Sequence, residues 1–330
     1  MLWLSFGFIV LGYATHWWQP ESLATLPFLS VVAHNTFVLV NTIWWGVLLG
    51  WVMMTLLGVI PRELVTGALG SGESARGIIR ATVAGVLLDL CSHGILMVAA
   101  KLYERGASTG QVMAFLIASP WNSFSFTLVL FALIGVVWTA VFIAASMLIA
   151  VITGLWFERL VRQGTLPPNP HRHTVEPDFE FWSAAQAFFK GTQWSWRGMR
   201  PALVTGLKES RMVLRWILFG MVLAALVQGL LGPELFANYF GPTLAGIGLT
   251  LMLAAVIEVC TEGSVPLAAG LVNEARAPGN GFAFLMGGVA TDYTEIMVLK
   301  EASGSWKMAL ALPLLTLPQV LMIGGLMNVI

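Results

Sequence analysis

The chain has 330 residues, of which 57% are hydrophobic and only 10% are charged, and its mean hydropathy is +0.81. Soluble domains carry about 25% charged and about 45–50% apolar residues, so this composition excludes disordered chains, fibrous proteins and most soluble enzymes, and it predicts an integral membrane protein. The 17 basic and 17 acidic residues cancel, which leaves no basic excess for a nucleic acid, and two cysteines are too few for a disulfide framework.

Apolar runs long enough to cross a bilayer follow one another along most of the chain. The N-terminal run, residues 1–18, has no early Lys or Arg and no small-residue cleavage site, so we expect a retained membrane segment rather than a cleaved signal peptide. Further runs have the length of about 20 residues that a span requires, and they lie at residues 34–60, 77–100, 109–133, 135–157, 212–232, 243–271, 279–299 and 308–330. Because backbone groups in lipid must be hydrogen-bonded within their own segment, these runs predict an all-α polytopic membrane protein with about nine transmembrane helices.

One segment between the predicted spans is polar. Residues 159–181 hold prolines at positions 167, 168, 170 and 177 and charges of both signs, which is typical of a solvated loop. Residues 182–207 predict a helix at the membrane interface, because tryptophans lie close to basic residues there. Nine of the 17 basic residues lie between Arg159 and Arg215, so the positive-inside rule places this central loop in the cytoplasm.

Two blocks of about thirty residues align without a gap when the chain is shifted by 169 residues. The first block starts at Cys91 and the second at Cys260, and in both an acidic residue precedes the cysteine by two positions and a glycine follows it by three. Shared Ala and Leu follow from composition alone, but rare residues at matched positions indicate a true repeat. Duplicated halves are typical of transporters, whose substrate sites lie between the repeats near the midplane. Each half holds an even number of predicted spans, which favours parallel repeats over inverted ones.

The repeat motifs predict helix breaks around polar groups. The acids, Asp89 and Glu258, lie within apolar runs, where an ionised carboxylate costs about 2.5–3.5 kcal/mol unless it faces a cavity or a partner. Glycine or proline can break the helix at each motif, and the N–H groups freed at the next half-helix can hold an anionic or polar ligand. The alternative is a kink packed against its neighbours with the acid hydrogen-bonded to Ser or Thr, and the symmetry of the two motifs favours the cavity. The candidate substrate-binding residues at these breaks are Cys91, Ser92, His93, Gly94, Cys260, Thr261, Glu262 and Gly263.

A second pair of predicted breaks follows the motifs. Residues 119–123 interrupt one helix, where Asn122 is the candidate ligand, and residues 287–295 interrupt its partner. In the second break Asp292 and Glu295, three residues apart, share one helical face next to Thr291. These acids lie either in the pore, which we favour, or at the membrane surface near residues 300–301.

The two cysteines occupy equivalent repeat positions. A free cysteine is usually a small buried hydrophobe, but a matched pair at two helix breaks also offers soft ligands to a thiophilic species. The motifs CSHG at Cys91 and CTEGSVPLAAGL at Cys260 resemble those of a predicted permease family that includes organoarsenical efflux permeases. The resemblance covers roughly residues 36–158 and 212–330, so it includes both halves and omits the N-terminal segment and the central loop.

The resemblance implies a polytopic permease of the bacterial inner membrane, in a family whose members of known substrate export trivalent methylated or aromatic arsenicals. It also implies that Cys91 and Cys260 are candidate ligands. Many relatives carry a second cysteine and a proline in the first motif, and this chain has His93 and Met97 at those positions. The missing third thiol makes permease a safer expectation than any named substrate.

Energy coupling is the last expectation. The chain has no Walker A loop, HExxH motif or paired aspartate motif, so we expect no enzymatic activity, no cofactor and a secondary or partner-driven transport mechanism. Burial disfavours the charged form of a carboxylate, which lets such a group exchange protons as a cavity opens to alternate sides. Asp89, Glu258 and Glu262 are the candidate proton-coupling acids. The competing interpretation is that they are permanently neutral, hydrogen-bonded groups that only fix the helix breaks.

These observations divide the chain into an N-terminal membrane segment (1–35), a first transmembrane repeat (36–158), a cytoplasmic loop with an interfacial helix (159–211) and a second repeat (212–330). The predicted function is a multi-pass membrane permease that exports a small solute, either an organoarsenical or another thiophilic species, with proton coupling. The alternatives are a channel or permease for a different small anion or metabolite, and a membrane assembly protein without transport activity. The expected partners are the solute and the lipid bilayer, with no nucleic acid, and a homo-oligomer is compatible with the sequence.

Overall fold

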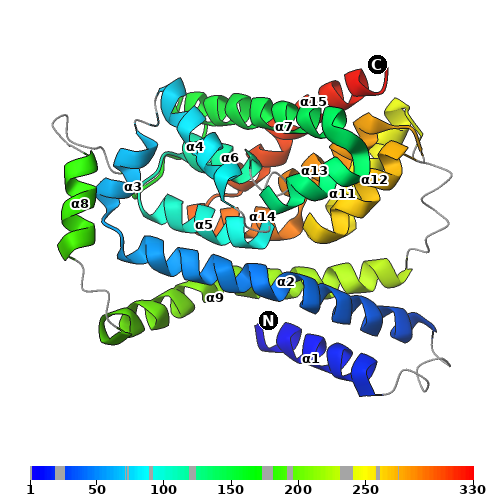
Figure 1. Ribbon diagram of the computed structural model, residues 1–330, viewed down its shortest axis with the longest axis horizontal. Coiled ribbons are helices and arrows are strands. Elements are labelled where there is room, and N and C mark those ends of the chain that lie inside the picture. Colours follow the sequence, from blue (N-terminus) through cyan, green and yellow to red (C-terminus); the bar gives the residue numbers. More distant parts are fainter. Residues whose placement is uncertain are drawn as a thin grey trace.

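The computed structural model describes residues 2–18, 27–70, 72, 74–88, 92–118, 124–172, 181–191, 196–230, 241–257, 261–273 and 275–330. These residues form helices joined by turns, with no β-strand among them (Figure 1). The helices are α1 (Leu2–Trp18), α2 (Pro27–Val59), α3 (Arg62–Leu69), α4 (Ala75–Leu87), α5 (Ser92–Glu104), α6 (Thr109–Ala118), α7 (Phe124–Arg162), α8 (Phe181–Gly191), α9 (Trp196–Leu230), α11 (Leu244–Ile257), α12 (Thr261–Asn273), α13 (Pro278–Thr291), α14 (Tyr293–Ser303) and α15 (Trp306–Met327). The all-α fold class is therefore confirmed.

The helices recur along the chain with the same offset of 169 residues that relates the sequence motifs. Helix α12 begins and ends 169 residues after α5 begins and ends. The first residues of three other helix pairs, α2 and α9, α4 and α11, and α7 and α14, are separated by the same number of residues. The backbone breaks agree as well, because Gly135 bends α7 with a φ of 81° and Gly304 ends α14 with a φ of 68°. Positive φ is readily available only to glycine, so these two residues set the same break in each half. The structural repeat thus extends further than the matched motifs and includes α2 and α9.

The two repeats have opposite orientations. In Figure 1 the equivalent helices α2 and α9 lie side by side, α2 running from right to left and α9 from left to right. Their antiparallel packing is also visible in a contact between Gly206, near the start of α9, and Thr55, near the end of α2. The expectation of parallel repeats is therefore wrong. That expectation relied on treating each apolar run as one span. Several core helices are too short to cross the bilayer, so the number of apolar runs is not the number of crossings.

Equivalent hydrogen bonds stabilise the start of the core helices in each half. The Ser74 hydroxyl accepts a hydrogen bond from the Gly77 backbone N–H (3.1 Å) at the start of α4, and Thr243 Oγ1 accepts one from the Gly246 N–H (3.0 Å) at the start of α11. Such N-caps satisfy backbone donors that have no partner within the helix. Gln111 in α6 and its counterpart Asn280 in α13 donate to carbonyl oxygens of the loop before α4 and α11, respectively.

Three helical segments among the described residues are long and apolar enough to cross a membrane: 127–162 in α7, 278–303 in α13 and α14, and 306–327 in α15. A fourth candidate is the end of α2 with α3, which are bent by 108°. Helices α4, α5, α6, α11 and α12 have 10–14 residues each, so none of them spans a bilayer alone. The count of about nine spans stays a prediction, because the core is built from broken helices.

The described part of the central loop is exposed along most of its length and is anchored at Asn169 and Arg172. Asn169 donates from Nδ2 to the carbonyl oxygens of Tyr103 (2.7 Å) and Ala107 (2.8 Å), and Arg172 lies 3.6 Å from the buried carboxylate of Glu158. The expected solvated loop holds for most of residues 163–172, since Gln163, Gly164, Thr165, Pro168, Pro170 and His171 are exposed and only Leu166 and Asn169 are buried, while residues 173–180 lie outside the described residues. The predicted interfacial helix over 182–207 is divided between two helices, because α8 ends at Gly191 and the long helix α9 begins at Trp196.

Candidate functional site

The second predicted break lies inside the protein. Asp292 lies between the end of α13 and the start of α14, with φ −58° and ψ 139°, so the helical span at 278–303 is interrupted at an acidic residue. Asp292 and Glu295 are only 4% and 3% exposed, which separates both carboxyl groups from the surface. Among the described residues, no group hydrogen-bonds the Glu295 Oε2 atom. A buried carboxyl oxygen without a hydrogen bond is costly, which makes Glu295 the candidate functional group at this break.

Helix α14 is held against α9 at both of its ends. At its start, Thr294 Oγ1 donates to the Trp216 carbonyl oxygen (3.3 Å), and the Tyr293 ring packs edge-on against Trp216, with 5.8 Å between ring centroids. At its end, Glu301 accepts a hydrogen bond from Trp216 Nε1 (2.7 Å) and pairs with Arg215. These contacts position the acidic first turn of α14 with little freedom to rotate.

Helix α14 contacts the other repeat through α5. Helices α14 and α5 pack side by side in the core of the molecule (Figure 1). Every residue of α5 from Ser92 to Tyr103 is buried, including Lys101, which pairs with Glu104 (3.0 Å). Ser92 Oγ and His93 Nδ1 lie 3.5 Å apart at the start of α5. The structure therefore places two broken helices from opposite repeats, each with polar side chains at its start, in contact with one another.

The second motif helix has an equivalent arrangement. Helix α12 packs against α7 of the first repeat, as α5 packs against α14 of the second. At this contact Asn273 of α12 donates to the Leu133 carbonyl oxygen (2.8 Å), just before the break at Gly135. Each motif helix thus lies against the other repeat, which makes the interface between the repeats the candidate site.

Several predicted residues lie outside the described part of the chain. These are Asp89, Cys91, Asn122, Glu258 and Cys260. Thr261, Glu262 and Gly263 begin α12, but their side chains are also outside the described set. Thr291 donates from Oγ1 to the Gly287 carbonyl oxygen (2.6 Å), which is a bond within its own helix. Among the described residues no group of three or more His, Cys, Asp or Glu side chains is arranged to hold a metal ion.

Sequence reasoning missed the residues that position the site. Arg215, Trp216 and Thr294 act on the acidic turn only through the packing of α14 on α9, and nothing in the local sequence connects positions about 80 residues apart. Lys101 could have been noticed, because it is a cation within an apolar helix and a buried cation is expected to have a partner.

Comparison with known proteins gives one match. A family model described as predicted permease (ArsP_1) matches residues 28–329, from the first turn of α2 to beyond the end of α15. The match includes both repeats and the central loop and excludes α1. No curated protein and no solved structure matches the chain significantly.

Proposed function

Because this chain belongs to the predicted permease family and is therefore a membrane permease, we propose that it is a secondary transporter that exports a small solute by alternating access across the bacterial inner membrane. The observation that carries the proposal is the pair of inverted repeats, whose broken helices α5 and α14 meet in the core. Inverted repeats can exchange conformations, so that a site between them opens first to one side and then to the other. Helix termini at the site supply the N–H groups and dipoles that bind a polar solute without external water.

The coupling group in this proposal is a carboxyl at the repeat interface. Glu295 has the required surroundings, since it is buried, lies in the first turn of α14 and lacks a hydrogen-bond partner for Oε2 among the described residues. Asp89, Glu258 and Glu262, the acids of the two motifs, belong to the same proposal. A buried carboxyl that binds a proton on one side of the membrane and releases it on the other can drive solute movement in the opposite direction.

The proposed solute is a thiophilic species such as a trivalent organoarsenical. This part of the proposal is supported by the two cysteines at equivalent motif positions, since thiolates are the protein ligands that soft ions prefer. A single cysteine in each motif makes two thiol ligands available per chain. A solute that can use two sulfur ligands therefore fits better than one that needs three.

Uptake into everted vesicles tests the proposal. Vesicles from cells that express the wild-type chain are supplied with trivalent metalloids, organoarsenicals and small anions in turn, with and without a proton-gradient uncoupler. We expect uptake of at least one thiophilic solute that stops when the uncoupler is added. Uptake that follows only the solute gradient and ignores the uncoupler would indicate a channel instead.

Two variants distinguish a loss of proton coupling from a loss of folding. Glu295→Gln removes titration at nearly constant shape, and we expect it to abolish uncoupler-sensitive uptake at normal protein levels. Glu63→Gln is the matched control, because Glu63 is exposed on α3 and undergoes the same chemical change. Equal proton-driven uptake by both variants, with the same pH profile, would remove Glu295 from the mechanism.

A further inference from the structure

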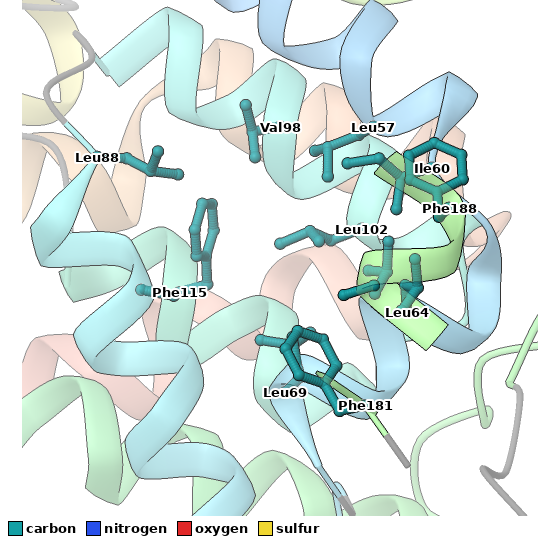
Figure 2. A pocket seen from close by; sticks show the side chains of 14 residues that line it. Leu57, Ile60, Leu64, Leu69, Leu88, Val98, Leu102, Phe115, Phe181 and Phe188 are labelled. Carbon is teal, nitrogen blue, oxygen red and sulfur yellow. The ribbon is translucent and has the colours of Figure 1, made fainter. Parts of the chain in front are cut away.

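A cavity of about 290 Å³ lies between the first repeat and α8, and no residue of α14 lines it. Its walls come from the end of α2, from α3, α4, α5 and α6, and from α8 of the central loop. All 14 lining residues are Leu, Ile, Val, Ala or Phe, so the cavity presents only hydrocarbon. Figure 2 shows Leu88, Val98 and Phe115 at one side of the cavity and Phe188 and Leu64 at the other, with Leu102 between them.

The cavity has a buried base and an exposed mouth. Val98 of α5 and Phe115 of α6 are almost completely buried and form the base. Ala68 of α3 also lines the cavity but is exposed, and Phe181 and Phe188 of α8 are partly exposed. The exposed lining residues place the mouth of the cavity at α3 and α8, and its base lies at α5 and α6.

Helices α3 and α8 have the features of interfacial helices. Helix α3 leaves α2 at 108°, so if α2 crosses the bilayer, α3 lies nearly parallel to its surface. In α3 the apolar side chains of Leu64, Val65 and Leu69 are buried while Arg62 is exposed, and α8 turns Ala185 inward while Trp182 is 77% exposed. Amphipathic helices with exposed Trp lie at the headgroup boundary, so the mouth of the cavity opens at the depth where acyl chains begin.

We propose that this cavity binds one acyl chain of an anionic membrane phospholipid, which enters between α3 and α8. An apolar cavity of about 150 Å³ stays dry and binds a benzene-sized molecule, so the present volume has room for an extended hydrocarbon but no polar partner for water. The bilayer supplies hydrocarbon at this depth. The Arg105 guanidinium donates to the carbonyl oxygens of Gly58 and Ile60 (2.9 Å for Ile60), and Ile60 lines the cavity next to Phe188 (Figure 2), so this cation lies close to the α8 side of the cavity, where it favours an anionic headgroup.

Photolabelling tests the proposal independently of transport. The purified full-length protein is reconstituted in phosphatidylcholine vesicles that contain phosphatidylglycerol with a diazirine at the end of one acyl chain, irradiated, digested and mapped by mass spectrometry. Lipid in the bilayer labels the outer face of α7, where Leu128 and Val136 are exposed. We expect additional label on the α5 peptide that carries Val98 and Leu102, which bulk lipid cannot reach.

Cavity-filling variants supply the control. Ala68→Trp places an indole at the mouth and is expected to remove the α5 label while the α7 label is unchanged. Ala187→Trp, on an exposed α8 position that does not line the cavity, is expected to keep both. Ala84→Leu narrows the cavity from inside, so it replaces Ala68→Trp if that variant does not fold.

Three outcomes would overturn the proposal. The first is wild-type protein labelled only on its outer helices. The second is α5 label that persists in both filled variants. The third is α5 label from a diazirine-bearing aromatic molecule in detergent but none from the lipid, because the occupant would then be a free apolar solute.

Discussion

Replacing Gly279 by alanine is expected to destabilise the protein, because α13 crosses α15 at this glycine. A methyl group at Gly279 would collide with the carbonyl oxygen of Gly324 and lie 2.8 Å from the Asn328 side chain. A carbonyl group within a helix cannot rotate away as the end of a side chain can, so the two helices have to move apart. The repeat counterpart, Gly110 in α6, faces the carbonyl oxygen of Gly154 in α7 in the same way, which indicates that both halves use this crossing.

The magnitude follows from two opposing effects at Gly279. Overpacking in a filled interior costs about 1–3 kcal/mol, whereas alanine is more favourable than glycine in a helix by up to about 1 kcal/mol. We therefore expect a net loss of about 1–2 kcal/mol. Gly325→Ala is the matched control, because among the described residues no atom beyond its chain neighbours and its own helix backbone lies within 4 Å of a methyl group there, and only the favourable helix effect remains.

The assay is thermal unfolding of both variants in the same detergent, followed by loss of the monodisperse protein peak. Gly279→Ala is expected to unfold at a lower temperature than wild type, and Gly325→Ala at the same or a higher temperature. If Gly279→Ala is as stable as Gly325→Ala, the close crossing of α13 and α15 does not exist and the reasoning is refuted.

Three further predictions concern the central loop, the cysteines and a buried ion pair. A Ser183→Cys variant in a cysteine-free background should resist an impermeant thiol reagent added outside intact cells, since the positive-inside rule predicts that α8 faces the cytoplasm; modification from outside would contradict this topology. Cys91→Ser and Cys260→Ser should each abolish transport of a thiophilic solute at normal protein levels, and wild-type activity in the double variant would assign both to packing. Arg172→Ala should lower the unfolding temperature because it leaves the buried Glu158 carboxylate without its cation. Adding Glu158→Gln should restore part of this loss, and no recovery would show that the pair does not act through charge.

The sequence alone was sufficient for the features that depend on local constraints. Helical structure follows from apolar runs, because a backbone in lipid must satisfy its hydrogen bonds within one segment. The repeat follows from rare residues at a constant offset, and the same offset relates Gly135 to Gly304, whose positive φ values break the two equivalent helices. The sequence also favoured an interior position for Asp292 and Glu295, because an acidic residue within an apolar run has to be shielded from lipid, and both side chains are buried in the structure.

Only the tertiary structure decided how these local elements are arranged. The antiparallel packing of α2 on α9 sets the inverted orientation of the repeats, and counting apolar runs misjudged it because the core helices are too short to cross the bilayer alone. Hydrogen bonds join residues that are far apart in sequence: Thr294 and Glu301 bond Trp216, and Asn169 bonds the end of α5. Such contacts depend on which helix faces meet. In a membrane protein the lipid and the protein interior are equally apolar, so a nearly uniform apolar sequence shows little periodicity that would identify the packed face of a helix.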